Sequence, residues 1–304
     1  MDWKGKTAFV TGAVSGLGFG IARAYSNAGM RLALGYRNED YRAEAERWFA
    51  DNGREMPLFL KLDVQDRARW AEVADEVESH FGKIHVLCNN AGVSVFGPTD
   101  EAIYDDYDWI MGVNFGGVVN GQVSFIPKIK SHGEGGHIVN VASMAAFISG
   151  PQAGIYTASK FAVRGLTECL RYNLAPYNIG VSLMCPGLVA TNAWTSALNR
   201  PAEFGQSGFG EVNKAELEQF GTAFELGMDP LEVGEKIVRG MTRNDPLILS
   251  HPEHGEDFTE IYEASMAALP KEEAPEGRLH IERLRREGNR AAAAGKRIEL
   301  SDLT

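Results

Sequence analysis

Tyr156 and Lys160 stand four residues apart and form a pair of side chains suited to moving a proton. The segment from Tyr156 to Ala175 is predicted to be a helix, and positions i and i+4 lie on one face of a helix. A lysine ammonium stabilises a phenolate, so the tyrosine could take a proton from an alcohol or give one to a carbonyl. A tyrosine and a lysine at this spacing also occur on ordinary solvated helix faces, so the surroundings must decide.

Ser143 lies thirteen residues before the tyrosine, at the end of a predicted strand. In parallel sheets, ligands bind at the carboxyl ends of the strands. A serine hydroxyl at such a place can orient and polarise a substrate oxygen. The sequence therefore predicts a site for alcohol or carbonyl chemistry at this edge of a sheet.

A glycine-rich turn, Thr11–Gly18, follows the first predicted strand and leads into a helix. Glycine allows left-handed backbone and close approach, and a helix N-terminus offers free N–H groups to a pyrophosphate. The spacing is G-x-x-x-G-x-G, and a tight structural turn is the alternative interpretation. The position after the first strand favours a dinucleotide site. The residues expected to bind the cofactor here are Gly12, Ser15, Gly16, Leu17 and Gly18.

The end of the second predicted strand bears on the choice of cofactor. An acid there typically accepts from the ribose 2′-hydroxyl of NAD, whereas an arginine accommodates the 2′-phosphate of NADP. The sequence has Tyr36, Arg37 and Asn38 at this point, with no acid before Glu39. NADP(H) is therefore the preferred cofactor and NAD(H) the other possibility, unless Arg37 is only a surface side chain. At the end of the third strand, Asp63 with Val64 would contact the adenine.

Short apolar runs alternate with segments of helical length, which is typical of a doubly wound α/β sheet with helices on both faces. We expect a Rossmann fold with a seven-stranded, mostly parallel sheet, comprising one catalytic domain over 1–270, a substrate lid at 192–228, and a helical extension or tail at 271–304. Asp229, Pro230 and Glu232 predict a helix start. The expected strands are Thr7–Val10, Arg31–Gly35, Leu58–Leu62, Ile84–Cys88, His137–Val141, Gly180–Met184 and Leu247–Ser250. The expected helices are Gly18–Ala28, Asp40–Asn52, Asp66–Phe81, Tyr104–Lys130 and Tyr156–Ala175, with another near Lys214–Glu225.

Composition excludes several classes of function. The 304 residues are 44% hydrophobic, enough for a large core, and 30 basic against 41 acidic residues give a net charge of −11. That charge argues against nucleic acid or an anionic membrane as a partner. No apolar run reaches the length of about 18 residues typical of a membrane span. The cysteines, Cys88, Cys169 and Cys185, are odd in number and far apart, so we expect a reducing, cytoplasmic location.

Together these motifs resemble the short-chain dehydrogenase/reductase family. Thr11–Gly18 is similar to its cofactor turn and Asn89–Gly92 to its N-N-A-G segment. Further matches to the family pattern follow in the family order, at Asn114, Ser143, Tyr156, Lys160, Pro186, Gly187, Val189 and Thr191. The resemblance implies that Asn90, Ala91 and Gly92 contact the cofactor, and that the segment from Pro186 to Thr191 holds the nicotinamide carboxamide.

The resemblance also implies a four-residue mechanism. Tyr156 would transfer the proton, and Lys160 would stabilise its phenolate and hold the nicotinamide ribose. Ser143 would bind the substrate oxygen, and Asn114 would anchor a water that relays the proton through Lys160. The family forms dimers and tetramers, so a homodimer or homotetramer is expected. The sequence departs from the family after the seventh strand, at 249–255, which puts the tetramer in doubt.

The substrate is expected to be a hydrophobic or aromatic secondary alcohol or its ketone. Ala145, Phe147 and Trp194 are predicted to contact it together with Ser143 and Tyr156, and packing within the core is the alternative for each aromatic residue. Two segments, 104–114 and 198–205, are similar to the branch containing bacterial lignin-type Cα-dehydrogenases, which use NAD on benzylic alcohols of aryl ethers. An enzyme of that kind is the alternative function. His251-Pro252-Glu253-His254 lacks a clear third metal ligand, so no metal site is predicted.

Overall fold

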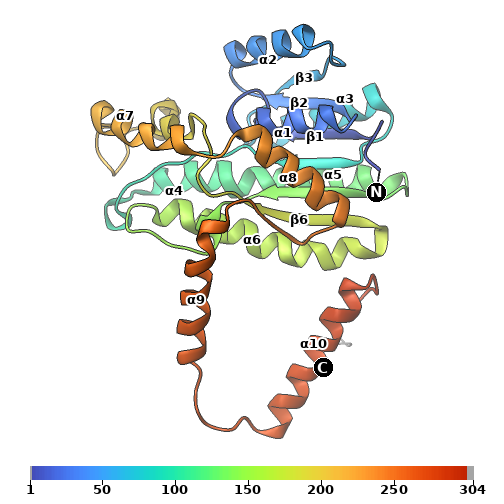
Figure 1. Cartoon of the computed structure of the whole chain (residues 1–304), viewed down its shortest axis with the longest axis vertical. Coiled ribbons are helices and arrows are strands. Elements are labelled where there is room, and N and C mark those ends of the chain that lie inside the picture. Colours follow the sequence, from blue (N-terminus) through green and yellow to red (C-terminus); the bar gives the residue numbers. More distant parts are fainter. Residues whose placement is uncertain (1, 300–304) are drawn as a thin grey trace.

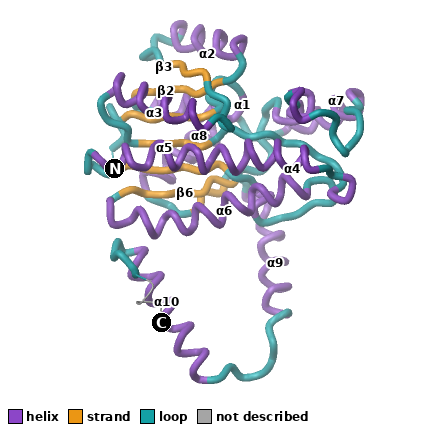
Figure 2. Tube along the Cα trace, turned by 180° about the vertical axis from the view of Figure 1, so that it is seen from behind, coloured by secondary structure: helices purple, strands orange, loops and turns teal. Residues whose placement is uncertain are grey.

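The computed structural model describes residues 2–299, within which seven strands form one parallel sheet in the order β3-β2-β1-β4-β5-β6-β7 (Figures 1 and 2). The predicted doubly wound fold is confirmed. β1 and β4 are hydrogen-bonded neighbours although two strands lie between them in sequence, and ligands bind at such switch points. The strands are β1 Thr7–Thr11, β2 Arg31–Tyr36, β3 Leu58–Lys61, β4 Val86–Asn89, β5 Gly136–Val141, β6 Ile179–Cys185 and β7 Leu247–Leu249.

Helices cover both faces of the sheet, which explains why the strands lack a polar face. They are α1 Gly16–Asn27, α2 Glu39–Asp51, α3 Arg67–Phe81, α4 Tyr104–Met111, α5 Gly117–Ser131, α6 Gly154–Leu174, α7 Lys214–Thr222, α8 Pro230–Arg243, α9 Gly255–Ala267 and α10 Glu276–Ala293. Phe9 of β1 points to the core beneath α3, α5 and α6, where it stacks on Phe125 at 4.7 Å between ring centroids. The next residue, Val10, packs on the opposite face, beneath α1 and α8.

The expected single helix from Tyr104 to Lys130 is wrong in one respect. The chain widens into a π-helical turn at Gly112–Gly116, which separates α4 from α5. Gly117 begins α5 directly against Val64, where a Cβ would meet the valine side chain at 2.8 Å. Sequence periodicity does not reveal such a turn, because helical spacing continues on both sides of it. π turns occur often at functional sites, and this one contains Asn114.

The segment 192–228 leaves the end of β6 and returns to α8 through short 3-10 turns and α7. Asp229 caps α8 as predicted, since its carboxylate accepts from the Leu231 amide at 2.6 Å and Pro230 follows it. The same segment lies near α4, because the short turn Ala202–Phe204 contacts that helix.

Two helices follow the sheet: α9 extends away from it, and α10 runs back toward it (Figure 1). α9 was not predicted; Phe258 near its start packs on Phe147 at 5.0 Å between ring centroids. α10 lies in the predicted helical segment 271–304, of which residues 300–304 fall outside the described part, and its end returns to α6 with Ala292 buried. Between residues 2 and 299, no helix is both long and apolar enough to cross a membrane.

Candidate active site

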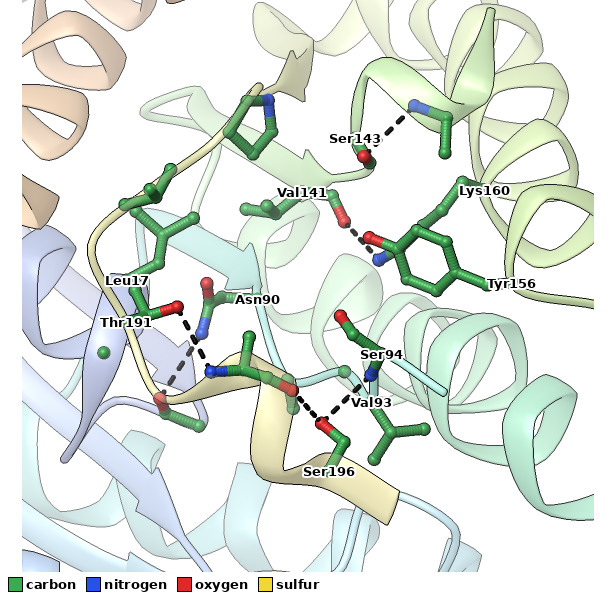
Figure 3. Close-up of a pocket in the computed structure, with 18 of the residues that line it drawn as sticks. Leu17, Asn90, Val93, Ser94, Val141, Ser143, Tyr156, Lys160, Thr191 and Ser196 are labelled. Atoms are coloured by element: carbon green, nitrogen blue, oxygen red, sulfur yellow. Dashed lines mark hydrogen bonds between the residues drawn. The ribbon is translucent and has the colours of Figure 1, made fainter. Parts of the chain in front are cut away.

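A cavity of about 930 Å³ opens at the carboxyl ends of the central strands. Tyr156, Lys160 and Ser143 lie on one side of it, and Leu17, Asn90 and Thr191 lie on the other (Figure 3). The parallel order of the strands produces this meeting, because the segments following β1, β4, β5 and β6 all leave the sheet at the same edge. The glycine-rich turn and the tyrosine–lysine pair thus share one cavity, as the sequence predicts. The predicted residues that line it are Gly12, Ser15, Gly16, Leu17, Gly18, Tyr36, Arg37, Asp63, Val64, Asn90, Ala91, Gly92, Ser143, Ala145, Tyr156, Lys160, Pro186, Gly187, Val189 and Thr191.

The glycine-rich turn has the form needed to receive a phosphate group. Gly12 and Gly16 have φ values of +60° and +48°, a region that side chains disfavour. A methyl group at Gly18 would collide with the Gly12 carbonyl oxygen, and one at Gly16 would meet Thr191 at 3.3 Å. α1 begins at Gly16, so its first N–H groups and its partial positive charge lie at the cavity. The residues present therefore fit a dinucleotide cofactor.

Asn90 braces this turn from the neighbouring strand. Its side-chain amide donates to the carbonyl oxygens of Thr11 at 2.9 Å and Gly12 at 3.3 Å. The Thr11 hydroxyl oxygen in turn accepts from the backbone amides of Asn90 and Ala91, at 2.9 and 3.0 Å. The N-N-A-G segment thus holds the glycine-rich turn in place through these hydrogen bonds, and it also lines the cavity.

The far end of the cavity is lined by the residues after β2 and β3. Arg37 is exposed there, and no ion pair or hydrogen bond of its side chain is found within residues 2–299. Asp63 lies nearby and accepts from the Gln65 amide at 3.0 Å. Asn38, predicted to bind the cofactor, does not line the cavity. Its side chain caps α2 by accepting from the Asp40 and Tyr41 amides, at 2.8 and 3.1 Å, because a helix begins directly after it.

Tyr156 and Lys160 lie one helical turn apart on α6, which begins two residues before the tyrosine. The lysine Nζ is 5.6 Å from the tyrosine ring centroid and donates to the Val141 carbonyl at 3.3 Å. Ser143, just beyond β5, accepts from the Ala145 amide at 3.1 Å (Figure 3). Lys160 is buried, so its ammonium is held in place beside the tyrosine rather than in solvent.

Asn114 does not line the cavity, and its side chain forms hydrogen bonds within the protein. Its Nδ2 donates to the Val93 carbonyl at 3.0 Å and to the Ser159 hydroxyl at 3.1 Å, while its Oδ1 accepts from the Val93 amide at 2.8 Å. Ser159 in turn donates to the Tyr156 carbonyl at 2.6 Å. The π turn therefore ties the helix that carries Tyr156 to the segment after β4.

Two predicted substrate residues lie elsewhere. Phe147 packs between Phe258 of α9 and the guanidinium of Arg164, 4.1 Å from its ring centroid, because the unpredicted α9 covers it. Trp194 packs against Gly221 of α7 and lines a second cavity of about 650 Å³ instead.

This second cavity adjoins the first, and the two share Ser94, Phe96 and Phe220 as lining residues. Phe96 lies beside Tyr156, with 5.9 Å between ring centroids, and beside Phe220, with 5.5 Å. Aromatic and aliphatic side chains, including Trp109, supply much of the wall of this second cavity. An apolar chamber therefore lies next to the tyrosine. The role of Phe220 was not predicted, because α7 is far from the catalytic motifs in sequence.

A buried ion pair fastens the segment 192–228 to α4. Asp106 accepts from Arg200 at 2.8 Å, from the Ser207 hydroxyl at 2.6 Å, and from the Ile103 and Gly208 amides at 3.0 Å each. Burial alone would raise the pKa of the Asp106 carboxyl, but these hydrogen bonds and the arginine charge outweigh burial and lower it. We call this group, Asp106 with Arg200 and Ser207, the clasp.

The buried thiols of Cys88 and Cys185 are poor nucleophiles. Burial raises the pKa of each to about 12. They accordingly fit the packed ends of β4 and β6 rather than the chemistry of the cavity.

Comparison with known proteins decides the family. The family model described as short chain dehydrogenase matches residues 6–201. The chain belongs to the short-chain dehydrogenase/reductase family. It is therefore an oxidoreductase of the NAD(P)-dependent dehydrogenase/reductase type.

Proteins of three bacteria align with nearly the whole chain. A C alpha-dehydrogenase of Sphingobium sp. strain SYK-6 is 38% identical over 93% of this chain and 93% of its own length. A solved short-chain dehydrogenase from Novosphingobium aromaticivorans is 36% identical, with a TM-score of 0.81 over 97% of this chain and 99% of that one. Another, from Burkholderia phymatum in complex with NAD, is 31% identical, with a TM-score of 0.80 over 90% and 99%.

Proposed function

We propose that this enzyme interconverts a hydrophobic or aromatic secondary alcohol and its ketone with NADP(H). The observation that carries the proposal is the shared cavity, in which Tyr156, Lys160 and Ser143 face the glycine-rich turn. When bound, the nicotinamide supplies or accepts a hydride at the carbinol carbon.

The protein's own groups would handle the substrate oxygen and its proton. Ser143 donates a hydrogen bond to that oxygen, and Tyr156 gives a proton to it in reduction or removes one in oxidation. Lys160, held by the Val141 carbonyl, stabilises the phenolate that remains after donation. Asn114 is assigned to the same machinery. Its side-chain contacts with Val93 and Ser159 support a positioning role, and a water relay would have to use its backbone.

The preference for NADP(H) is assigned to Arg37. Its exposed guanidinium at the end of β2 would pair with the 2′-phosphate, and no acidic residue stands between Tyr36 and Asn38 to favour NAD. Cofactor contacts are likewise proposed for the other predicted lining residues. Asn38 is the exception, because it caps α2.

The experiment follows reduced-nicotinamide absorbance with a panel of aryl and bulky ketones and alcohols and both cofactor pairs. We expect turnover with NADP(H), and we expect Arg37→Ala to lower kcat/KM for NADP(H) by about 10- to 100-fold, the value of a charged hydrogen bond. Activity with NAD(H) should be little changed. Arg67→Ala, at the exposed start of α3, is the matched control. Equal losses with both cofactors would contradict the assignment of Arg37.

A second candidate is an NAD-dependent Cα-dehydrogenase acting on benzylic alcohols of aryl ethers. Three observations favour it: the 38% identity to a C alpha-dehydrogenase, the NAD complex of a related structure, and the apolar chamber beside Tyr156. Turnover chiefly with NAD⁺ and benzylic alcohols in the same assay would select this candidate and overturn the NADP(H) proposal.

The remaining assignments concern organisation. We propose that 192–228 acts as a substrate lid on a catalytic domain spanning 1–270, because it supplies Phe220 to both cavities and is held by the clasp.

A homodimer or homotetramer is proposed through the helices α4–α5 and α6. The outward-facing apolar side chains of Val123 and Phe161, 70% and 44% exposed, support this surface.

A further inference from the structure

His251 lies two residues beyond β7 and contacts the turn Pro186–Leu188, which lies directly beyond β6. β6 and β7 are parallel neighbours, so the segments that follow them emerge side by side. The imidazole is buried, and its Nδ1 accepts from the Gly187 amide at 2.9 Å. Its Nε2 lies 2.8 Å from the Leu188 carbonyl oxygen, and the Ser250 hydroxyl lies 2.6 Å from Nδ1.

These contacts assign the tautomer of the ring. A backbone amide can only donate and a carbonyl oxygen can only accept, so Nδ1 is the unprotonated nitrogen and Nε2 carries the hydrogen. Both ring nitrogens are thereby engaged with the protein. His251 is therefore a clamp on two successive backbone groups of the turn, and it has no free nitrogen for a metal.

The rings of His251 and His254 also pack closely against the turn. A Cβ at Gly187 would lie 2.8 Å from Cγ of His251 and 2.9 Å from Nε2 of His254, so the turn rests directly on the two rings. On its other side, the Pro186 carbonyl accepts from the Met144 amide at 2.9 Å, next to Ser143. The turn is therefore held between the histidine and the segment that carries the serine.

We propose that His251 is a positioning residue that fixes the turn Pro186–Leu188 as the wall against which the nicotinamide end of the cofactor is held. The proposal rests on the proposed function in one respect, that this turn faces the nicotinamide. Gly187 and Leu188 line the cavity that contains Tyr156, so a shift of the turn would move that wall. The glycine-rich turn at the other end of the cavity would be unaffected.

Two kinds of ligand distinguish these ends of the cavity. NADP⁺ and NAD⁺ reach the turn, whereas ADP-ribose and its 2′-phosphate lack the nicotinamide and report only on the glycine-rich turn and β2. For His251→Leu we expect binding of the intact dinucleotide to weaken about tenfold, the value of one to two hydrogen bonds. Binding of the matching ADP-ribose should stay within about twofold, which is within the scatter of a site that loses no hydrogen bond.

A conservative variant separates positioning from folding. In His251→Asn, the side-chain oxygen can replace Nδ1 as acceptor for the Gly187 amide, so we expect dinucleotide binding between the wild-type and leucine values. His80→Gln, exposed on α3 and away from the cavity, is the matched control and should bind the dinucleotide as the wild type does. The KM for the dinucleotide should rise more than kcat falls.

The results that overturn the proposal are specific. Equal weakening of both ligands, with a lowered Tm and no recovery in His251→Asn, would mean that His251 only stabilises the fold. Unchanged dinucleotide binding in His251→Leu would mean that the turn needs no clamp. If the wild-type chain binds ADP-ribose but not the dinucleotide, the turn does not face a nicotinamide, and the positioning role falls. If it binds neither, the proposed function fails first.

Discussion

The two edges of the sheet gather similar polar side chains with opposite results. At the carboxyl edge, Tyr156, Lys160 and Ser143 line an open cavity. At the amino edge, Glu134 is surrounded by Lys6, Lys83 and His85, all within ion-pair distance. Lysines and a titratable partner occur at both edges, but at the amino edge they pair with one another, whereas at the carboxyl edge they line a cavity.

At the amino edge, the polar side chains bind one another. Hydrogen bonds from Lys83, Lys6 and His85 hold the pKa of the Glu134 carboxyl well below its usual range. His85, His132 and Glu134 lie close enough together to resemble a metal site, yet His132 contacts the Ile84 carbonyl and the Glu134 amide through its two nitrogens. The difference teaches that residue type alone does not identify chemistry. Substitutions should therefore affect turnover at one edge and stability at the other.

The largest effect is expected at Tyr156. Tyr156→Phe removes the hydroxyl that transfers the proton, so kcat should fall by about 10²- to 10⁴-fold, the usual contribution of general acid–base catalysis. Cofactor binding and the Tm should stay near wild type, because the ring still fills its place beside Phe96. Steady-state kinetics and cofactor titration would measure both. Tyr172→Phe, farther along α6 and outside the cavity, is the matched control. A loss of similar size in that variant would break the contrast.

The clasp tests whether the carboxyl edge needs its lid. Asp106→Asn removes the charge partner of Arg200, whose side chain is 11% exposed, and the cost of breaking a fully buried ion pair, about 3–5 kcal/mol, is the upper bound. Because Arg200, Ser207 and Gly208 all belong to the segment 192–228, the cost should appear as opening of that segment. We expect faster amide hydrogen exchange there and a higher KM for bulky substrates.

The control for the clasp is an exposed ion pair on α6. Arg164 and Glu168 lie 2.8 Å apart with both side chains partly in solvent, and pairs of this kind contribute about 0.3–0.5 kcal/mol. Glu168→Gln should therefore leave exchange in 192–228 and the KM unchanged. Unaltered exchange in Asp106→Asn would show that the aromatic contacts, not the clasp, hold the segment closed.

The glycine turn and the tyrosine–lysine pair could be predicted because their chemistry restricts residue type and spacing. A pyrophosphate requires glycine at Gly12, Gly16 and Gly18, and a proton-transferring tyrosine requires a cation one helical turn away. The central strands were predictable because both of their faces are buried, which gives continuous apolar runs. The resemblance to the family depends on these same restrictions.

The rest depends on contacts between distant parts of the chain. Asp106 and Arg200 are separated by 94 residues, and nothing near either one indicates an ion pair. The π turn at Gly112–Gly116 preserves helical spacing on both sides, so periodicity conceals it. For His251 a signal did exist: it follows the seventh strand, whose carboxyl end adjoins that of the sixth. Recognising it requires the strand order as well as the motif.

The effect at the amino edge should leave turnover at neutral pH unchanged and appear only in acid. Burial lowers the pKa of His137 on β5 to about 3, and its Nε2 lies 2.8 Å from the Ser182 hydroxyl. An unfolded histidine has a pKa of about 6.5, so between about pH 6.5 and pH 3 the unfolded chain binds the extra proton and the folded chain does not. This group should therefore reduce stability by about 1.4 kcal/mol for each unit that the pH falls in that range.

Urea unfolding between neutral pH and about pH 4 would measure this contribution, since most of that range lies between the pKa values of the histidine in the unfolded and the folded chain. His137→Asn removes the titration, so its stability should decline less steeply with acid, although it should start lower at neutral pH because packing near Trp3 is lost. His80→Gln, exposed on α3, should leave the slope unchanged. The kcat of His137→Asn at neutral pH should equal that of the wild type, because the side chain lies at the edge of the sheet opposite the cavity. A fall in kcat with an unchanged acid slope would reverse the roles assigned to the two edges.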